Sequence, residues 1–160
     1  MAHYLVYYKE YWNDIKEGYS TPTGNWTTQS QKFYKSVRPR DTLWAVVFGE
    51  IDGTSKWCLV ERIQIARVDP IQSETKWGEF HLIGDKKKSQ IFPLKGQPDL
   101  TPILWMLKFP SGKRIRQQGP RIGQALQANG FRQLAESAAI LLEEYAQTIE
   151  SVLKVKNKSK

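Results

Sequence analysis

Through most of the chain, apolar residues gather in short runs bounded by turn residues, a pattern typical of β-strands. The Asp52-Gly53 pair between two of the longest runs indicates a hairpin. In the second of these runs the apolar positions change parity, which predicts a β-bulge near Glu61 and Arg62. The predicted strands are 4–8, 42–50, 56–68, 80–83, 91–94 and 103–109.

Helical spacing of apolar residues is clearest near the end of the sequence. Leu134, Ala138 and Tyr145 belong to a series that predicts a long amphipathic helix over 133–153. Short helices are predicted within 28–37 and 122–128, while 9–18 is either a short helix or an irregular connection. We expect one α+β domain over 1–153, with flanking helices, and a flexible basic tail over 154–160.

Composition narrows the class of protein. With 160 residues, of which 40% are apolar, the chain is long enough for one domain with a buried core. The net charge of +8 favours a polyanionic partner, nucleic acid before an acidic membrane. Cys58 is the single cysteine, which excludes an internal disulfide and a cysteine-rich zinc site. No apolar run reaches 18 residues and the first residues lack a signal-peptide pattern, so we expect a soluble cytoplasmic protein without a membrane partner.

A turn signal places one tryptophan among small polar residues. In Gly24-Asn25-Trp26-Thr27 the ring has no apolar neighbours in sequence, and amide and hydroxyl groups flank it. Such a ring can stack on a nucleic-acid base while its neighbours bond the base edge. Equally, Trp26 can close the end of the core while Asn25 and Thr27 satisfy the turn backbone. A second aromatic candidate, Trp77, borders a polar loop and fits either role.

Three basic clusters make a phosphate-contacting surface more plausible than any one of them does. A single run of charges usually marks no more than a solvated face, but three runs with a strongly positive total favour a nucleic-acid backbone. The clusters are Lys35, Arg38 and Arg40; Lys86, Lys87 and Lys88; and Lys113, Arg114, Arg116 and Arg121.

Signals for catalysis are few. His3 and His81 are the only histidines and neither sits in a metal-ligand spacing. No phosphate-binding loop or nucleophile elbow occurs. Glu74-Thr75-Lys76 matches half of a nuclease metal site, so a metal-dependent nuclease is the alternative enzyme hypothesis. We expect no enzyme activity, no metal and no cofactor.

Four motifs follow one another along the chain: Tyr4-Leu-Val-Tyr-Tyr-Lys9, Gly24-Asn-Trp-Thr-Thr28, Leu43-Trp-Ala-Val-Val-Phe48 and Trp57-Cys-Leu-Val-Glu-Arg62. Their order, over roughly residues 3–95, resembles the PUA-like superfamily, in particular its YTH and EVE branches. The segment from Arg38 to Trp44 also resembles the EVE pattern in which a basic residue and Gly-Asp lead into the central strand. Here Arg40 stands where that pattern has Gly.

The resemblance implies both a fold and a function. The fold is a small twisted β-barrel of about five to six strands, and the function is to hold a flipped, methylated base of RNA or DNA in an aromatic cage. Trp26 matches the cage tryptophan and Thr27 the hydroxyl residue that bonds the base. The second cage aromatic is expected near Gly84, where no ring occurs, so Trp77 would have to replace it. The expected base-binding residues are Lys9, with Glu10 beside it, Asn25, Trp26, Thr27 and Trp77.

We therefore expect a non-enzymatic reader of a modified base, with nucleic acid as its partner. The phosphate contacts are expected from the three basic clusters. The nuclease, and a protein-interaction module that uses the C-terminal helix, stay open as alternatives.

Overall fold

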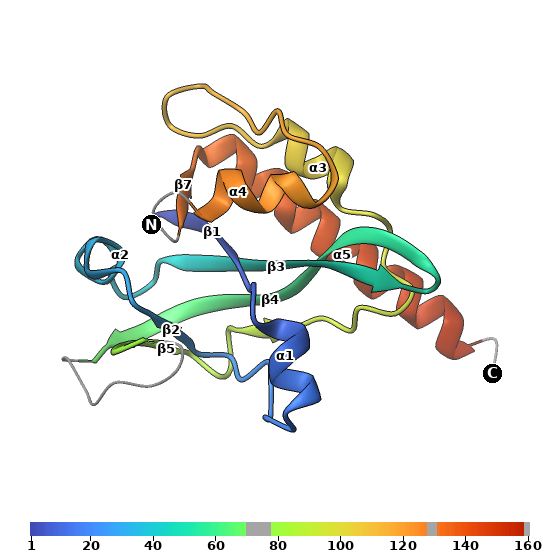
Figure 1. Ribbon diagram of the computed structural model, residues 1–160, viewed down its shortest axis with the longest axis horizontal. Helices are drawn as coiled ribbons and strands as arrows, with labels where there is room; N and C mark the ends of the chain where they lie inside the picture. Colours follow the sequence, from blue (N-terminus) through green and yellow to red (C-terminus); the bar gives the residue numbers. More distant parts are fainter. Residues whose placement is uncertain (70–77, 128–130, 159–160) are drawn as a thin grey trace.

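The computed structural model describes residues 1–69, 78–127 and 131–158 of the chain. Helices lie on both sides of a mixed β-sheet (Figure 1). The strands are β1 (His3–Tyr7), β2 (Trp26–Thr28), β3 (Thr42–Ile51), β4 (Thr54–Val68), β5 (Phe80–Gly84), β6 (Gln90–Ile91) and β7 (Arg132–Leu134). The helices are α1 (Tyr11–Lys16), α2 (Gln31–Ser36), α3 (Thr101–Met106), the 3₁₀ turn η1 (Gly119–Arg121), α4 (Ile122–Gln127) and α5 (Glu136–Lys158).

The strands pair in the order β2-β5-β4-β3-β1-β7, with β6 paired to β4 off this path. Because β1 and β3 are parallel, the whole segment between them forms one crossover. The pairing leaves the sheet open among the described residues, with β2 at one edge and β7 at the other. The α+β class is confirmed, whereas the expected closure into a barrel is not shown.

The β3–β4 hairpin is confirmed, and its turn has the backbone that an Asp-Gly pair favours. Asp52 and Gly53 have φ angles of 57° and 77°, the left-handed region used by two-residue hairpin turns. Both faces of the hairpin are apolar because each packs on its own set of elements. On the first face, Trp44 packs with residues of α3, α4 and α5. On the second face, Tyr11 of α1 and Phe33 of α2 pack against the neighbouring strand positions.

A bulge in β4 turns Glu61 toward the second face of the hairpin. Val46 pairs with Leu59 and Ala45 pairs with Glu61, so Val60 is the extra residue opposite β3. Ala45 belongs to the second-face cluster, and a residue paired with it across the strands shares that face. The predicted bulge is therefore confirmed, and it accounts for the change of parity in the sequence.

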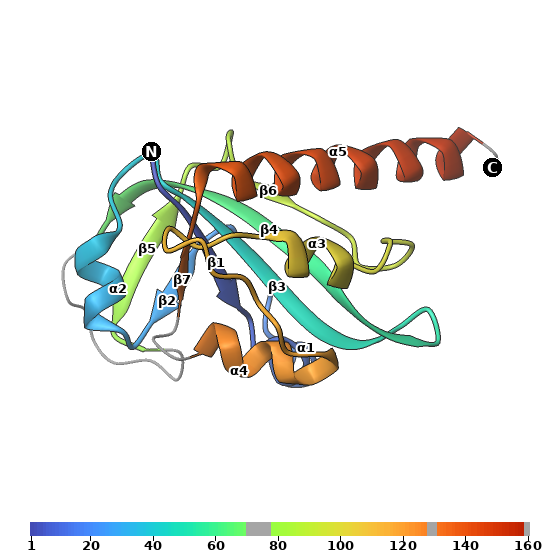
Figure 2. The same cartoon turned by 90° about the horizontal axis from the view of Figure 1, so that it is seen from above.

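Beyond the short strand β6, a side chain completes the outer edge of β4. The amide of Gln97, 2% exposed, accepts a bond from Leu59 N at 3.0 Å and donates one to Leu59 O at 2.7 Å. The Tyr145 hydroxyl of α5 donates to Pro98 O at 2.6 Å, which fixes this loop against the long helix. Figure 2 shows α5 running beside β4.

The predicted strand over 103–109 is wrong, because a helix begins just before it. The Asp99 carboxylate accepts bonds from Thr101 N at 3.0 Å and Thr101 Oγ1 at 2.7 Å, and Pro102 lies in the first turn of α3. These are helix-starting features. Leu104 and Leu107 are buried whereas Trp105 is 40% exposed, so the apolar run winds around a helix and only one side of it faces the core.

Two short strands also differ from expectation. β2 lies in a segment predicted as a turn, and β7 occupies the start of the predicted long helix. Strands of three residues arise from pairing with β5 and β1, which leaves no local periodicity in the sequence. Helix α5 begins at Glu136 and continues to Lys158, so residues 154–158, predicted as a flexible tail, are helical. Within the described part of the chain, no helix combines the length and apolar character needed to cross a bilayer.

The turn before β3 contains a residue in an unusual backbone conformation. Arg40 has φ of 78°. This left-handed conformation costs a residue with a Cβ about 1–2 kcal/mol, a cost that glycine does not have. Its amide donates to Ile65 O at 2.8 Å, and this bond holds the turn against β4.

We expect Arg40→Gly to be more stable than Arg40→Ala by about 1 kcal/mol, because both remove the charge but only Gly relieves the positive φ. Urea unfolding of the two variants measures the difference. Arg38, which lacks a positive φ, is the matched control: there Ala should be at least as stable as Gly. If Ala is at least as stable as Gly at position 40 as well, the Arg40 backbone carries no strain.

Candidate functional site

A pocket of about 410 Å³ opens on the second face of the hairpin. Its walls come from the end of β1, from α1 and from the segment that leads into β2, and Glu61 of β4 also lines it. Figure 1 shows α1 and β2 on the same side of β3 and β4. The volume lies within the range of sites that take small ligands or single groups of larger ones.

Trp26 and Tyr8 form an aromatic wall of this pocket. Trp26 begins β2, pairs with Leu82 of β5 and packs in part against the second-face cluster. The Tyr8 ring meets it edge-on, with centroids 5.6 Å apart and planes at 84°. Such an edge-to-face contact fixes the orientation of both rings. The half-buried indole therefore combines the two roles that its sequence context left open, contact with the core and a position in a pocket wall.

Hydrogen bonds hold the Tyr8 ring in place. Its hydroxyl donates to Asp14 Oδ2 at 2.5 Å and lies 2.6 Å from Thr21 Oγ1, which can donate in return. Asp14 is fully buried. Burial and the bond to Asp14 raise the pKa of Tyr8, so the phenol stays neutral. The aromatic wall is thus tied to both α1 and the segment before β2.

Two hydrogen bonds, each between a backbone amide and a side chain, dock the Gly24 turn on β4 and β5. Gly24 N donates to Glu61 Oε2 at 3.4 Å, and Gly84 N donates to Asn25 Oδ1 at 3.0 Å. Gly24 has φ of 79°, which favours glycine. A Cβ on Gly84 would lie 1.9 Å from Gly24 O, so only glycine allows this approach. The turn that carries Asn25 and Trp26 is therefore positioned by residues far away in sequence.

Glu61 is a carboxyl group buried in the pocket wall. The residue is 1% exposed and burial raises the pKa of its side chain to about 7, against an ordinary value of 4.5. The bond from Gly24 N acts in the opposite direction and is the smaller effect. Near neutral pH this group is divided between a neutral form that donates and accepts hydrogen bonds and an anion that only accepts.

Four of the five base-binding residues expected from the sequence line this one pocket: Lys9, Asn25, Trp26 and Thr27. The fifth, Trp77, lies outside the described residues. Glu10 lines the pocket as well. Sequence reasoning missed Tyr8, at the end of the first strand, and Glu61, a carboxylate in an apolar run beside the predicted bulge. The remaining lining residues that it missed are Tyr7, Asp14, Tyr19, Ser20, Thr21, Thr23 and Gln29.

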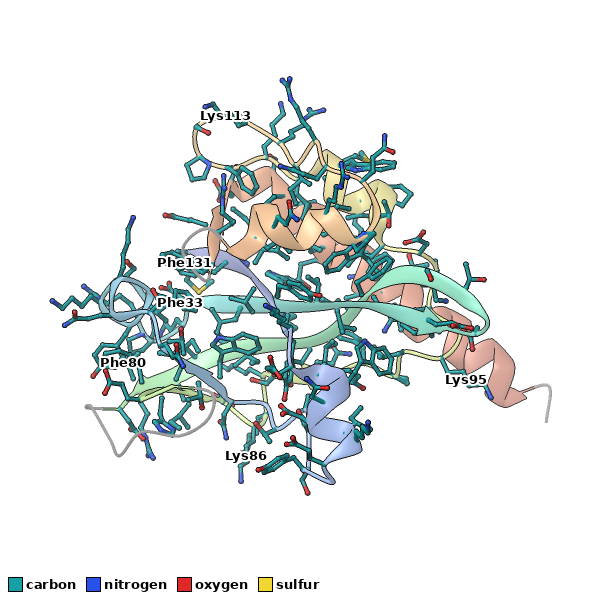
Figure 3. All side chains as sticks on the ribbon, in the orientation of Figure 1. Phe33, Phe80, Lys86, Lys95, Lys113 and Phe131 are labelled. Carbon is teal, nitrogen blue, oxygen red and sulfur yellow. The ribbon has the colours of Figure 1, made fainter. Side chains whose placement is uncertain are left out.

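The three basic clusters do not share one surface. Lys86, Lys87 and Lys88 are exposed in the turn after β5, two residues beyond the Gly84 amide that bonds Asn25. Figure 3 shows Lys86 on the side of α1 and Lys113 at the opposite side of the molecule, beyond α4. The third cluster, Lys113, Arg114, Arg116 and Arg121, is exposed there. Arg38 and Arg40 are exposed between α2 and β3, and Arg38 Nη1 bonds the carbonyl oxygens of Lys35 and Val37.

The nuclease hypothesis remains a prediction without a test, because Glu74 and Lys76 lie outside the described residues. Within the described ranges, no group of three or more His, Cys, Asp and Glu side chains is arranged to hold a metal ion. His3 Nδ1 accepts a bond from Trp44 Nε1 at 3.1 Å, a structural role near the first-face cluster.

No protein-family model matches the chain, and no curated protein matches it significantly. The function has to be inferred from the geometry of the pocket.

We expect the stability of the protein to fall as pH rises from about 4.5 to above 7, because the folded state holds the Glu61 proton that the unfolded chain releases. Glu61→Gln keeps an acceptor for Gly24 N and has no proton to lose. The variant should match the wild type at pH 5 and be more stable at pH 8, by up to about 3 kcal/mol. Urea unfolding of both proteins at each pH measures this. Parallel curves would mean that the carboxyl has an ordinary pKa.

Proposed function

We propose that the protein is a nucleic-acid reader that takes a modified base into the pocket beside Trp26. The observation that carries this proposal is the combination, in one pocket, of an aromatic wall, several polar side chains and a buried carboxyl. Planar heterocycles are recognised in this way, by stacking on a ring and by hydrogen bonds to the base edge. The proposal covers RNA and DNA alike, since neither ring stacking nor edge contacts distinguish them.

Each side chain around Trp26 would make a different contact with the base. The indole supplies the stacking surface, and Tyr8, held edge-on to it, supports the indole. Asn25 uses its carbonyl oxygen on Gly84 N, so its amide nitrogen is the group that can turn to a ligand. Thr27 and Lys9 line the same pocket and add a hydroxyl and an ammonium group. A methyl group on the base would enlarge the apolar contact with the rings.

The basic turn after β5 provides the matching phosphate contacts. Lys86, Lys87 and Lys88 are exposed, and Asp85 Oδ1 accepts bonds from the amides of Lys87 and Lys88 at 2.9 and 3.2 Å, which fixes the turn. A flipped base stays attached to its backbone, so cations next to the pocket act where phosphates must pass. The cluster around Lys113 lies too far away to serve the same nucleotide.

The resemblance to the EVE branch of the PUA-like superfamily supports this function, and we extend the proposal to the fold. Arg40 has a positive φ at the position where that pattern has glycine, the residue which adopts such a backbone most readily. The long strand β4 pairs with β3 along one part and with β5 along another, and the β2–β5 pair continues the sheet over the second-face cluster. The strand order is compatible with a PUA-like barrel that is incompletely closed.

We expect Trp26→Ala to weaken binding of a short single-stranded oligonucleotide carrying a methylated base by about 1–3 kcal/mol, the range for stacking of a base on an aromatic side chain. Fluorescence anisotropy measures the affinity, and the loss should be smaller on the unmodified oligonucleotide. Trp12→Ala, which removes an indole that does not line the pocket, is the control for affinity. Trp57→Ala is the control for stability, since its indole is fully buried and its loss costs about 3–5 kcal/mol. If Trp26→Ala unfolds as readily as Trp57→Ala while keeping the preference for the modified base, Trp26 is only a core residue.

We also expect replacement of Lys86, Lys87 and Lys88 by Ala to reduce the salt dependence of binding. Each phosphate contact contributes about 0.7 to 0.9 to the slope of log K against log salt, so the slope should fall by up to about 2–3. The matched control replaces Lys113, Arg114 and Arg116, which removes the same formal charge on the far side. An equal loss of slope in both triple variants would show that binding is not centred on the pocket.

A further inference from the structure

Glu61 is a buried carboxyl that the fold leaves with little compensation. Among the described residues it takes one hydrogen bond, the long one of 3.4 Å from Gly24 N, and it forms no ion pair. Burial of a carboxyl with so few partners is unfavourable. Its side chain nevertheless lines the pocket, where a ligand would supply the missing hydrogen bonds.

The bulge decides which of two adjacent charged residues faces this pocket. Glu61 shares the second face with Ala45, whereas Arg62 lies on the first face. There its guanidinium pairs with Glu143 of α5 at 2.7 Å and lies over the Trp44 ring, 5.5 Å from the centroid. The cation next to Glu61 in sequence is thus held on the other side of the sheet, and the carboxyl in the pocket wall forms no ion pair among the described residues.

We propose that Glu61 selects bases whose Watson–Crick edge carries an amino group beside an unprotonated ring nitrogen, namely cytosine and adenine. This inference rests on the proposed function, that the pocket holds a base. A neutral carboxyl group presents a carbonyl acceptor next to a hydroxyl donor. The amino group donates to the carbonyl oxygen and the ring nitrogen accepts from the hydroxyl, so two parallel hydrogen bonds close on one edge.

Other bases fit this group less well. The edge of guanine with two adjacent donors requires an ionised carboxylate, which is costly at a buried site where the carboxylate forms no ion pair within the described part of the chain. Uracil, thymine and the O6 and N1–H pair of guanine offer a carbonyl oxygen to the hydroxyl donor, and a carbonyl oxygen is a weaker base than a ring nitrogen. Sharing the proton with a ring nitrogen gives a charge-assisted bond, which is the stronger kind.

Tyr8, Tyr11 and Cys58 do not compete with the Glu61 carboxyl for its proton. Burial raises the pKa of Tyr8 and of Tyr11, so both phenols stay neutral. Burial also raises the pKa of the Cys58 thiol, to about 12. Asp14 accepts the Tyr8 hydroxyl. The remaining titratable residues of the pocket lining are Tyr7, whose pKa is raised by burial, and the exposed Lys9, Glu10 and Tyr19.

The test uses short single-stranded oligonucleotides whose central nucleotide is cytosine, adenine, guanine, thymine or abasic. Affinities of the full chain are measured between about pH 5.5 and 8.5, for the wild type, Glu61→Gln and Glu61→Ala. We expect the wild type to bind the cytosine or adenine probe about tenfold or more tightly than the thymine probe at pH 6. This preference should shrink as pH rises, because the carboxyl loses its proton, while guanine binding does not weaken. Glu61→Gln should abolish the pH dependence of the preference, and Glu61→Ala the preference itself.

Three outcomes would overturn the inference, and one of them separates it from the function on which it rests. If the abasic probe binds as well as the others, no base enters the pocket and the proposed function fails too. If a base is required but guanine binds best at every pH and Glu61→Gln abolishes this, the pocket reads two donors with a carboxylate. If the preference survives in folded Glu61→Ala, as judged by thermal melting, the carboxyl does not touch the base. Wild-type data alone decide the first outcome and reveal the guanine preference of the second, so neither observation depends on the folding of a variant.

Discussion

The architecture depends on hydrogen bonds to the backbone N–H and C=O groups along both edges of the long strand β4. Its inner edge pairs with β3, but no single strand spans its outer edge. β5 and β6 cover one part, the Gln97 amide bonds Leu59, and Asp99 Oδ1 accepts from Trp57 N at 3.3 Å. Unpaired backbone groups in a buried strand are costly, so the loop that carries Gln97 and Asp99 is as much part of the sheet as a strand would be.

The same strand links the stability of the fold to the chemistry of the pocket. Its bulge sends Arg62 to α5, where the guanidinium secures the long helix, and sends Glu61 to the pocket, where the carboxyl opposes folding as pH rises. Binding sites often keep groups that the fold alone would not select. The docking of the Gly24 turn on Glu61 joins the two halves of the site, because the carboxyl that faces the pocket also positions the turn that bears Trp26.

Local signals in the sequence were sufficient for the hairpin, the bulge and the clustering of Asn25, Trp26 and Thr27. They were insufficient where structure arises from distant pairing: β2 exists because it pairs with β5, and β7 because it pairs with β1. The error over 103–109 has a different origin, since the Asp-Leu-Thr-Pro start of α3 was readable and apolar density outweighed it. Tyr8 and Glu61 could have been found, because one closes the first strand and the other is a carboxylate at the predicted bulge. Trp77 lies outside the described residues, so its assignment stays a prediction.

The parallel pairing of β1 with β3 places nearly every pocket residue in one crossover, from the end of β1 to the start of α2, and Glu61 alone comes from the hairpin. The C-terminal helices pack on the other face and contribute no residue to the pocket lining. One short segment can therefore accumulate substitutions that alter ligand preference while the larger hydrophobic cluster stays unchanged. Such a division makes the chain a scaffold in which specificity can diverge, or be engineered, at little cost in foldability.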